Sequence, residues 1–172
     1  MIDVSKYSAA DKLKDGTPVV VRAIRRDDSG AILEAFQGLD RDSIYTRFFA
    51  YKRELTDTDL SRITDIDFNN VVALVAIIPQ NGQLIGGGRY YRDTAHNSAE
   101  LAFMTDDAYH GRGLASLILR RLVAIAREQG VERFEADVLA RNAGMLTVFN
   151  RSGLPMQIEN DGATIHVSLS LQ

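Results

Sequence analysis

The residues best suited to chemistry lie between His110 and Ala115, which have the sequence His-Gly-Arg-Gly-Leu-Ala. Two glycines lie in a turn that follows a predicted strand, Ser98–Thr105, and opens a predicted apolar helix, Gly113–Gln129. Glycine lets the backbone approach a ligand closely, and the first N–H groups of a helix have no partner within it. This order is typical of a cradle for an anion such as a diphosphate, with the helix dipole adding to the attraction.

The same glycines also suit an ordinary tight turn, so on these residues alone ligand binding and a purely structural turn stay equally open. Arg112 adds a charge that suits a phosphate. His110 has two interpretations, a phosphate partner or a solvated loop residue. The Walker and Rossmann patterns fit badly, because Gly-Lys-Ser/Thr is missing and because the strand before the turn belongs to a series of hairpins.

Composition excludes several classes of function. With 172 residues and a hydrophobic content of 45%, the chain suits one globular core. A net charge of −3 does not favour a nucleic-acid partner, and no apolar run is long enough to predict a membrane span. The chain has no cysteine, and His96 and His166 lack the spacing of metal ligands. We expect a cytoplasmic protein without a metal.

Hydrophobic periodicity predicts a mixed α/β domain over residues 15–172, preceded by an arm at residues 1–14. The turn pairs Asn81-Gly82 and Asp161-Gly162 predict hairpins, and a crossover helix predicts one parallel pair of strands. The predicted strands are Thr17–Ile24, Val71–Ile78, Gln83–Arg92, Ser98–Thr105, Val131–Leu139 and Thr164–Leu171. The predicted helices begin near Asp27, Asp42, Thr56, Gly113 and Arg141.

The glycine turn resembles the cofactor loop of the GNAT N-acetyltransferase superfamily, which has the pattern Gln/Arg-x-x-Gly-x-Gly/Ala. His110, Gly113 and Ala115 occupy the three defined positions, and only the histidine departs from the pattern. The likeness extends over roughly residues 13 to 171 to the acetyltransferase domain of bacterial protein lysine acetyltransferases, which modify acyl-CoA synthetases. The segments that carry it are Asp15–Pro18, Arg22–Ile24, Arg47–Phe49, Ile66-Asp67 and Ala99–Phe103.

This resemblance implies a largely antiparallel central sheet with helices on both faces and a splayed pair of strands that holds coenzyme A. The backbone of Ala102, Phe103 and Met104 would bind the pantetheine amides, and Asn142 would reach the cofactor or only cap its helix. The phosphate-binding residues implied are His110, Gly111, Arg112, Gly113, Leu114 and Ala115.

Glu100 matches the glutamate assigned as general base in the resembling enzymes. A lysine amine has a reference pKa of about 10.4, so attack on a thioester needs a group that removes a proton. In a partly apolar strand, between Ala99 and Leu101, we expect this carboxylate to have a raised pKa suited to that task. On the residues alone, a surface or salt-bridged glutamate is the stronger interpretation, and the resemblance reverses that order.

Many members of the superfamily place a tyrosine as general acid where this chain has Phe149. Coenzyme A can leave as a thiolate, since a thiol has a reference pKa of about 8.5, so the reaction tolerates this loss. Tyr90 and Tyr91 are the possible substitutes, although both also suit a sheet.

We therefore expect an enzyme that moves an acetyl group from acetyl-CoA to a protein lysine, with acyl-CoA synthetases among the candidate partners. Acetylation of a small amine is a second hypothesis. A CoA-sensing or interaction module with little turnover is a third, and Phe149 keeps it open.

Overall fold

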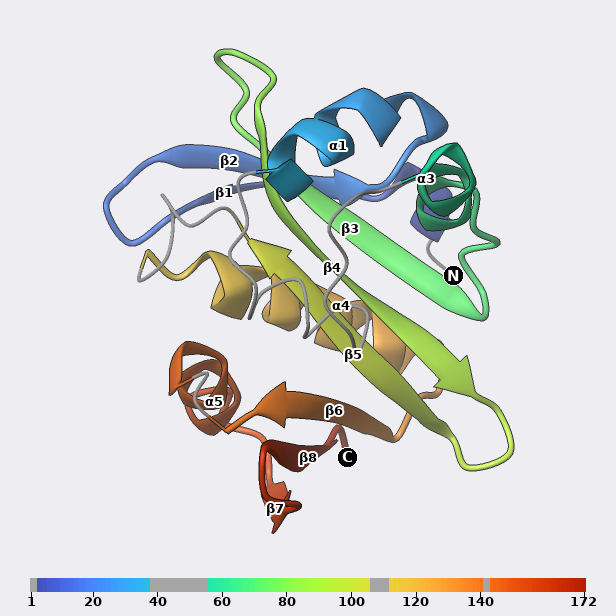
Figure 1. Cartoon of the computed structure of the whole chain (residues 1–172), viewed down its shortest axis with the longest axis vertical. Coiled ribbons are helices and arrows are strands. Elements are labelled where there is room, and N and C mark those ends of the chain that lie inside the picture. The colour runs from blue at the N-terminus through green and yellow to red at the C-terminus, as the bar shows by residue number, and fades with distance from the viewer. Residues whose placement is uncertain (1–2, 38–55, 106–111, 141–142) are drawn as a thin grey trace.

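A computed structural model describes residues 3–37, 56–105, 112–140 and 143–172 (Figure 1). Within them, eight strands form one sheet in the order β1-β2-β3-β4-β5-β6-β8-β7. Neighbouring strands are antiparallel except β5 and β6, which are parallel. The strands are β1 (Ser8–Lys12), β2 (Pro18–Ala23), β3 (Val71–Ile77), β4 (Leu84–Asp93), β5 (Ser98–Thr105), β6 (Arg133–Leu139), β7 (Met156–Asn160) and β8 (Thr164–Ser170).

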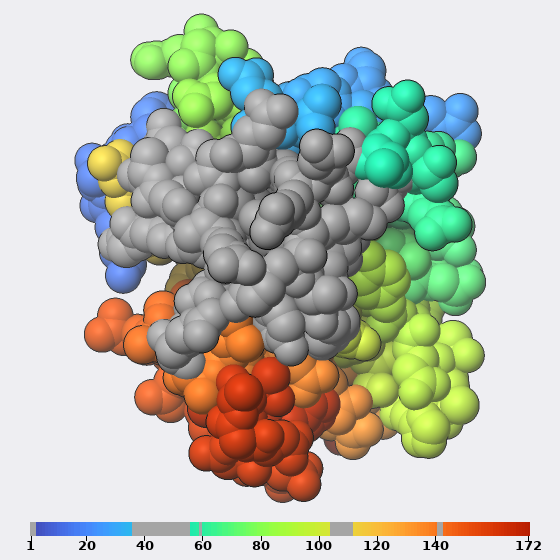
Figure 2. All heavy atoms as spheres, in the orientation of Figure 1, coloured from blue at the N-terminus to red at the C-terminus, as the bar shows by residue number. Residues whose placement is uncertain are grey.

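Helices cover both faces of this sheet, as predicted. The described helices are η1 (Val4–Lys6), η2 (Arg26–Asp28), α1 (Ser29–Gln37), α3 (Asp57–Thr64), α4 (Leu114–Glu128) and α5 (Ala143–Asn150). Helices α1 and α3 lie over one face near β3 and β4, whereas α4 crosses the opposite face (Figure 1). In the space-filling view, α1 and α3 lie at one end of the molecule and β7–β8 at the other (Figure 2).

Two clusters of buried side chains hold these layers together. The larger cluster joins α4 and α5 to the sheet and includes Phe103, Leu114, Ile118, Leu122, Phe134 and Phe149. The smaller cluster lies under α1 and α3 and includes Ile24, Ile32, Leu60, Ile63, Ala73 and Val75. Helix α4 forms because apolar residues recur at its core spacing, and every residue of that pattern that we name is at most 3% exposed: Leu114, Leu117, Ile118, Leu122 and Ile125.

The N-terminal residues expected as an arm are part of the sheet. Strand β1 pairs with β2 from Ser8↔Arg22 to Lys12↔Pro18, while Val4 and Leu13 are buried in the larger cluster. The sequence of β1, Ser-Ala-Ala-Asp-Lys, lacks the β-branched and aromatic residues that indicate a strand. Three of the five side chains of this edge strand are exposed, so it needs little of that signal.

The predicted helix near Asp42, with Ile44, Phe48 and Phe49, lies outside the described residues. The other predicted elements agree with the structure to within a few residues. The glycines at positions 86–88 lie within β4, and the one register shift against β3 falls beside them, where Ala76 faces Gly86 and Ile77 faces Leu84.

A buried ion pair joins β2 to the start of α1. The guanidinium of Arg22 donates to both carboxylate oxygens of Asp28, at 2.9 and 2.8 Å, and the Arg25 N–H donates to Asp28 at 2.7 Å. Burial opposes ionisation of Asp28, but these hydrogen bonds outweigh it and lower the pKa of Asp28 below its usual value. The stability that the pair contributes is present above the usual aspartate pKa and is lost as the pH falls through the lowered one.

We predict that Asp28→Asn lowers the free energy of unfolding by about 3 kcal/mol, because it leaves a largely buried guanidinium without its charge partner. Urea unfolding at neutral pH measures this loss, and the difference from the unsubstituted protein should shrink in acid. Asp65→Asn is the matched control, since the Arg26–Asp65 pair has side chains 79% and 55% exposed and should contribute about 0–1 kcal/mol. Equal losses in the two variants would contradict the structural role of Asp28.

Candidate active site

The sheet opens where β5 and β6 separate. These strands pair only from Ser98↔Arg133 to Glu100↔Glu135, although β5 continues to Thr105 and β6 to Leu139. On its other side β5 stays paired with β4 over its full length. Figure 1 shows the two arrows diverging beyond their short contact. Residues 101–105 therefore keep one edge within the sheet and turn the other away from β6.

Packing around Phe103 holds β5 in this position. The Phe103 side chain is 4% exposed, and the ring of Phe149 from α5 lies edge-on to it with centroids 6.2 Å apart. Gly88 on β4 makes room for it, because a Cβ there would stand 3.0 Å from the Phe103 ring and 2.8 Å from Ile118 of α4. Phe149 is 1% exposed and thus belongs to the core.

The glycine turn leads directly into α4. Gly113 is the N-cap residue, with a φ of 85° that a glycine adopts readily, and no side chain caps the helix. The turn contacts the β1–β2 loop, since the Lys14 N–H donates to the Arg112 carbonyl at 3.0 Å and the Lys14 side chain lies across Gly113. Arg112 pairs with Asp15 at 3.2 Å.

Asp15 has partners that keep it ionised. The Thr17 hydroxyl and then the Thr17 N–H donate to its carboxylate, and these hydrogen bonds lower the pKa of Asp15. The Asp-Gly-Thr sequence noted in the resemblance therefore fixes a loop that orients Arg112. The sequence had not indicated this contact, because nothing local connects residue 15 with residue 112.

Most of the predicted cofactor-binding residues are described by the structure, and three are not. Ala102, Phe103, Gly113 and Leu114 lie on the separating strand or at the start of α4, with the side chains of Phe103 and Leu114 buried. Met104 lies on β5 opposite Gly87, and Ala115 lies in the first turn of α4. His110, Gly111 and Asn142 lie outside the described residues.

Glu100 occupies the last residue of β5 that is paired with β6. Its neighbours Ala99 and Leu101 point into the core under α4, so Glu100 lies on the opposite face, where its side chain is exposed. The predicted apolar surroundings of the Glu100 carboxylate are therefore not found, because its side chain is exposed. Its register partners are Tyr91 on β4 and Glu135 on β6.

The two tyrosines named as substitutes for Phe149 lie on opposite faces. Tyr90 is fully buried on the α4 side, and its hydroxyl donates to Gln129. Burial also raises the pKa of Tyr90, so it is a poor proton donor at neutral pH. Tyr91 is half-buried and lies beside Glu100, on the same face.

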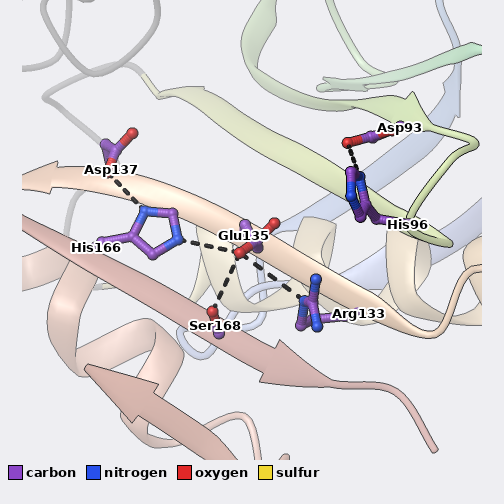
Figure 3. Close-up of polar contacts among 7 residues, drawn as sticks. All are labelled: Asp93, His96, Arg133, Glu135, Asp137, His166 and Ser168. Atoms are coloured by element: carbon purple, nitrogen blue, oxygen red, sulfur yellow. Dashed lines mark hydrogen bonds and ion pairs between the residues drawn. The ribbon is translucent and has the colours of Figure 1, made fainter. Parts of the chain in front are cut away.

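A polar cluster that the sequence had not suggested begins at Glu135, the register partner of Glu100 on β6. Figure 3 shows this cluster. His166 of β8 bonds Asp137 through Nδ1 at 2.8 Å and Glu135 through Nε2 at 3.2 Å. Arg133 lies 3.8 Å from Glu135. The charged residues alternate along β6, which was a usable signal, but the pairing with β8 was not visible in the sequence.

Two classes of site lack support in the described part of the chain. No described helix is long and apolar enough to cross a membrane. No three His, Cys, Asp or Glu side chains among the described residues are grouped so as to hold a metal ion.

Strands that separate at one end and a glycine turn that opens a helix are both features that the resemblance to the GNAT superfamily implies. The chain belongs to the acetyltransferase (GNAT) family, whose model matches residues 39–154. It is an acetyl-CoA-dependent N-acetyltransferase.

Individual relatives agree with this family. The GNAT domain of S. lividans PAT has a TM-score of 0.85 and 33% identity, over 95% of this chain and 96% of that domain. Acetyltransferase PA5475 of Pseudomonas aeruginosa is 27% identical over 90% of this chain and 84% of its own length. Acetyltransferase Pat of Mycolicibacterium smegmatis is 32% identical over 65% of this chain, which spans 34% of that protein.

The fold alone is shared with the spermidine N-acetyltransferase of Vibrio cholerae in complex with CoA and spermine. That structure has a TM-score of 0.70 and 17% identity, and the match covers 89% of this chain and 95% of that chain.

We predict that Gly113→Ala weakens acetyl-CoA binding, because a side chain at this φ strains the turn and crowds the Lys14 side chain. Gly130→Ala is the matched control, since Gly130 has a φ of 84° just beyond the other end of α4 and open space around it. Both variants should lose about 1–2 kcal/mol of stability. Calorimetric titration should find a higher Kd only for Gly113→Ala; a Kd that rises equally in both would contradict the prediction.

Proposed function

We propose that this enzyme acetylates a lysine side chain of a protein substrate, with Glu100 as the general base. The observation that carries this proposal is the place of Glu100, at the residue where β6 leaves β5. A base at that point lies next to the strand segment proposed for the thioester end of acetyl-CoA. Its exposure leaves it accessible to a long cationic side chain from another molecule.

The cofactor is proposed to lie along the edge of β5 that β6 leaves. Because the side chains of Phe103 and Leu114 are buried, these residues can offer only backbone groups. The backbone of Ala102, Phe103 and Met104 would then pair with the pantetheine amides as an added strand does. The turn before α4 would take the diphosphate on its N–H groups, with Arg112 adding charge and with His110, Gly111, Leu114, Ala115 and Asn142 completing the proposed set.

In the proposed mechanism, Glu100 takes one proton from the substrate ammonium, which frees the nitrogen lone pair. When bound, acetyl-CoA supplies the acetyl group as a thioester with a thiolate as leaving group. The nitrogen forms a bond to the acetyl carbon as the carbon–sulfur bond breaks. The nitrogen loses its second proton on becoming an amide, which balances the proton that the thiolate takes up. Backbone N–H groups of β5 that point away from β4 would polarise the carbonyl oxygen during transfer.

The leaving group would depart without a tyrosine at position 149. Phe149 lies in the core against Phe103, so its role in this chain is to support β5. Tyr91 is the described tyrosine that lies beside Glu100, and it is the candidate donor if the thiolate receives its proton from the protein.

The protein acceptor is supported by the resemblance of the chain to bacterial protein lysine acetyltransferases. The likeness to the S. lividans PAT domain extends over almost the whole chain, which strengthens this choice. Acyl-CoA synthetases are the substrates to test first. A small amine is the alternative acceptor, and a CoA sensor is the alternative without turnover.

We predict that Glu100→Gln lowers kcat by about 100- to 10,000-fold, the usual contribution of a general base, while acetyl-CoA binding stays unchanged. Stopped-assay release of free thiol gives kcat, and calorimetry gives the affinity for acetyl-CoA. Glu128→Gln, an exposed glutamate at the end of α4, should behave like the unsubstituted enzyme. Full turnover by Glu100→Gln would refute the role of Glu100.

The acceptor is tested by supplying acetyl-CoA with a purified acyl-CoA synthetase and, separately, with a panel of small amines. Mass spectrometry should locate acetyl-lysine in the synthetase, and the modification should disappear with Glu100→Gln. Turnover with small amines alone would replace the protein acceptor by a metabolite. Acetyl-CoA binding without transfer to either would favour the sensor.

A further inference from the structure

Glu100 is the first of a row of side chains that crosses the sheet on the face opposite α4. The register places Glu135 of β6 directly beside Glu100, and Ser168 of β8 beside Glu135. Neighbouring strands lie about 4.8 Å apart, and paired residues point to the same face, so the register places the two glutamates next to each other on one face of the sheet. A nearby like charge makes a carboxylate hold its proton more tightly.

His166 fixes the second glutamate of this row. Its Nε2 lies 3.2 Å from a carboxylate oxygen of Glu135, and its Nδ1 lies 2.8 Å from Asp137 (Figure 3). An imidazole that serves two carboxylates in this way donates from both nitrogens and so carries a positive charge. The hydrogen bond to Asp137, followed by that to Glu135, raises the pKa of His166, which agrees with this geometry.

Other charges face these groups within the described residues. Next to His166, β7 contributes Glu159, its register partner. Arg133 lies two residues before Glu135 on the same strand, with the ion pair at 3.8 Å. The register brings these titratable or charged side chains of β4 to the same face as Glu100: Arg89, Tyr91 and Asp93.

We propose that Glu135 and His166 set the basicity of Glu100: Glu135 as the neighbouring carboxylate that strengthens its hold on a proton, and His166 as the cation that positions Glu135 and moderates this effect. Both are positioning residues, because they act through Glu100. The inference rests on the proposed role of Glu100 as general base. It assigns the control of this base to neighbouring charged groups, because Glu100 is exposed and burial does not act on it.

Removal of the two groups should move the acid limb of the kcat/KM profile in opposite directions. Glu135→Gln removes the like charge, so Glu100 loses its proton more easily and the limb moves to lower pH. His166→Gln removes one of the two cations beside Glu135 and leaves only Arg133, so the limb moves to higher pH. Each shift should be about half a pH unit, as expected for unit charges at the protein surface.

The experiment measures kcat/KM from acid to neutral pH for these two variants and for the double variant. If His166 acts through Glu135, its substitution should shift the limb by less than half as much when Glu135 is already Gln. His166→Lys keeps a cation beside Glu135 and should return the limb toward its original position. His96→Gln is the control, because His96 forms a comparable pair with Asp93 at 2.8 Å in an exposed turn (Figure 3).

The proposal is overturned if the acid limb of the kcat/KM profile stays in place in both single variants, or if it moves in the same direction in both. It is also overturned if His166→Gln shifts the limb equally with and without Glu135. If His166→Gln fails to fold, Glu135→Gln alone still tests the proposal, which is overturned when the acid limb of that variant stays in place. Suppose that Glu100→Gln loses turnover while the acid limb of Glu135→Gln stays in place. Glu100 would then remain the general base, and only the inference about Glu135 and His166 would fail. Full activity of Glu100→Gln would instead remove the proposed function.

Discussion

The parallel contact between β5 and β6 is the constraint on which the site depends, because it ends after Ser98–Glu100 and Arg133–Glu135. A longer pairing would cover the edge of β5 and leave no backbone for a ligand. Three features keep the strands apart beyond this point. Strand β4 holds β5 on its other side, Gly88 admits the Phe103 ring, and Phe149 from α5 packs against that ring.

The same contact brings the chemistry of the site together. At its last residue pair it places Glu100 beside Glu135, and β8 adds His166 on the far side of Glu135. The ionised groups therefore lie on the face opposite α4, while the apolar side chains of β5 fill the core beneath. This short pairing therefore lies between the edge of β5 proposed to bind the cofactor, the polar face that carries Glu100 and the buried side chains that support β5.

Much of the fold was predictable because strong local patterns agree with it. The apolar run of β3, the hairpin turns and the periodicity of α4 each specify one element. The glycine turn was predictable as a ligand site only through the resemblance, since Gly113 alone also suits a simple turn. Strand β1 escaped prediction, because its pairing with β2 supplies the stability that its own residues do not indicate.

Contacts between distant residues were not predictable. Lys14 and Asp15 reach the turn at Arg112, and His166 reaches Glu135, only because strands pair in a given register.

The central claim is that acetyl-CoA occupies the edge of β5 that β6 leaves, and residue-resolved amide hydrogen exchange with and without acetyl-CoA tests it most directly. The account predicts that exchange slows in residues 101–104 and at the start of α4. Protection elsewhere, with none in β5, would contradict it.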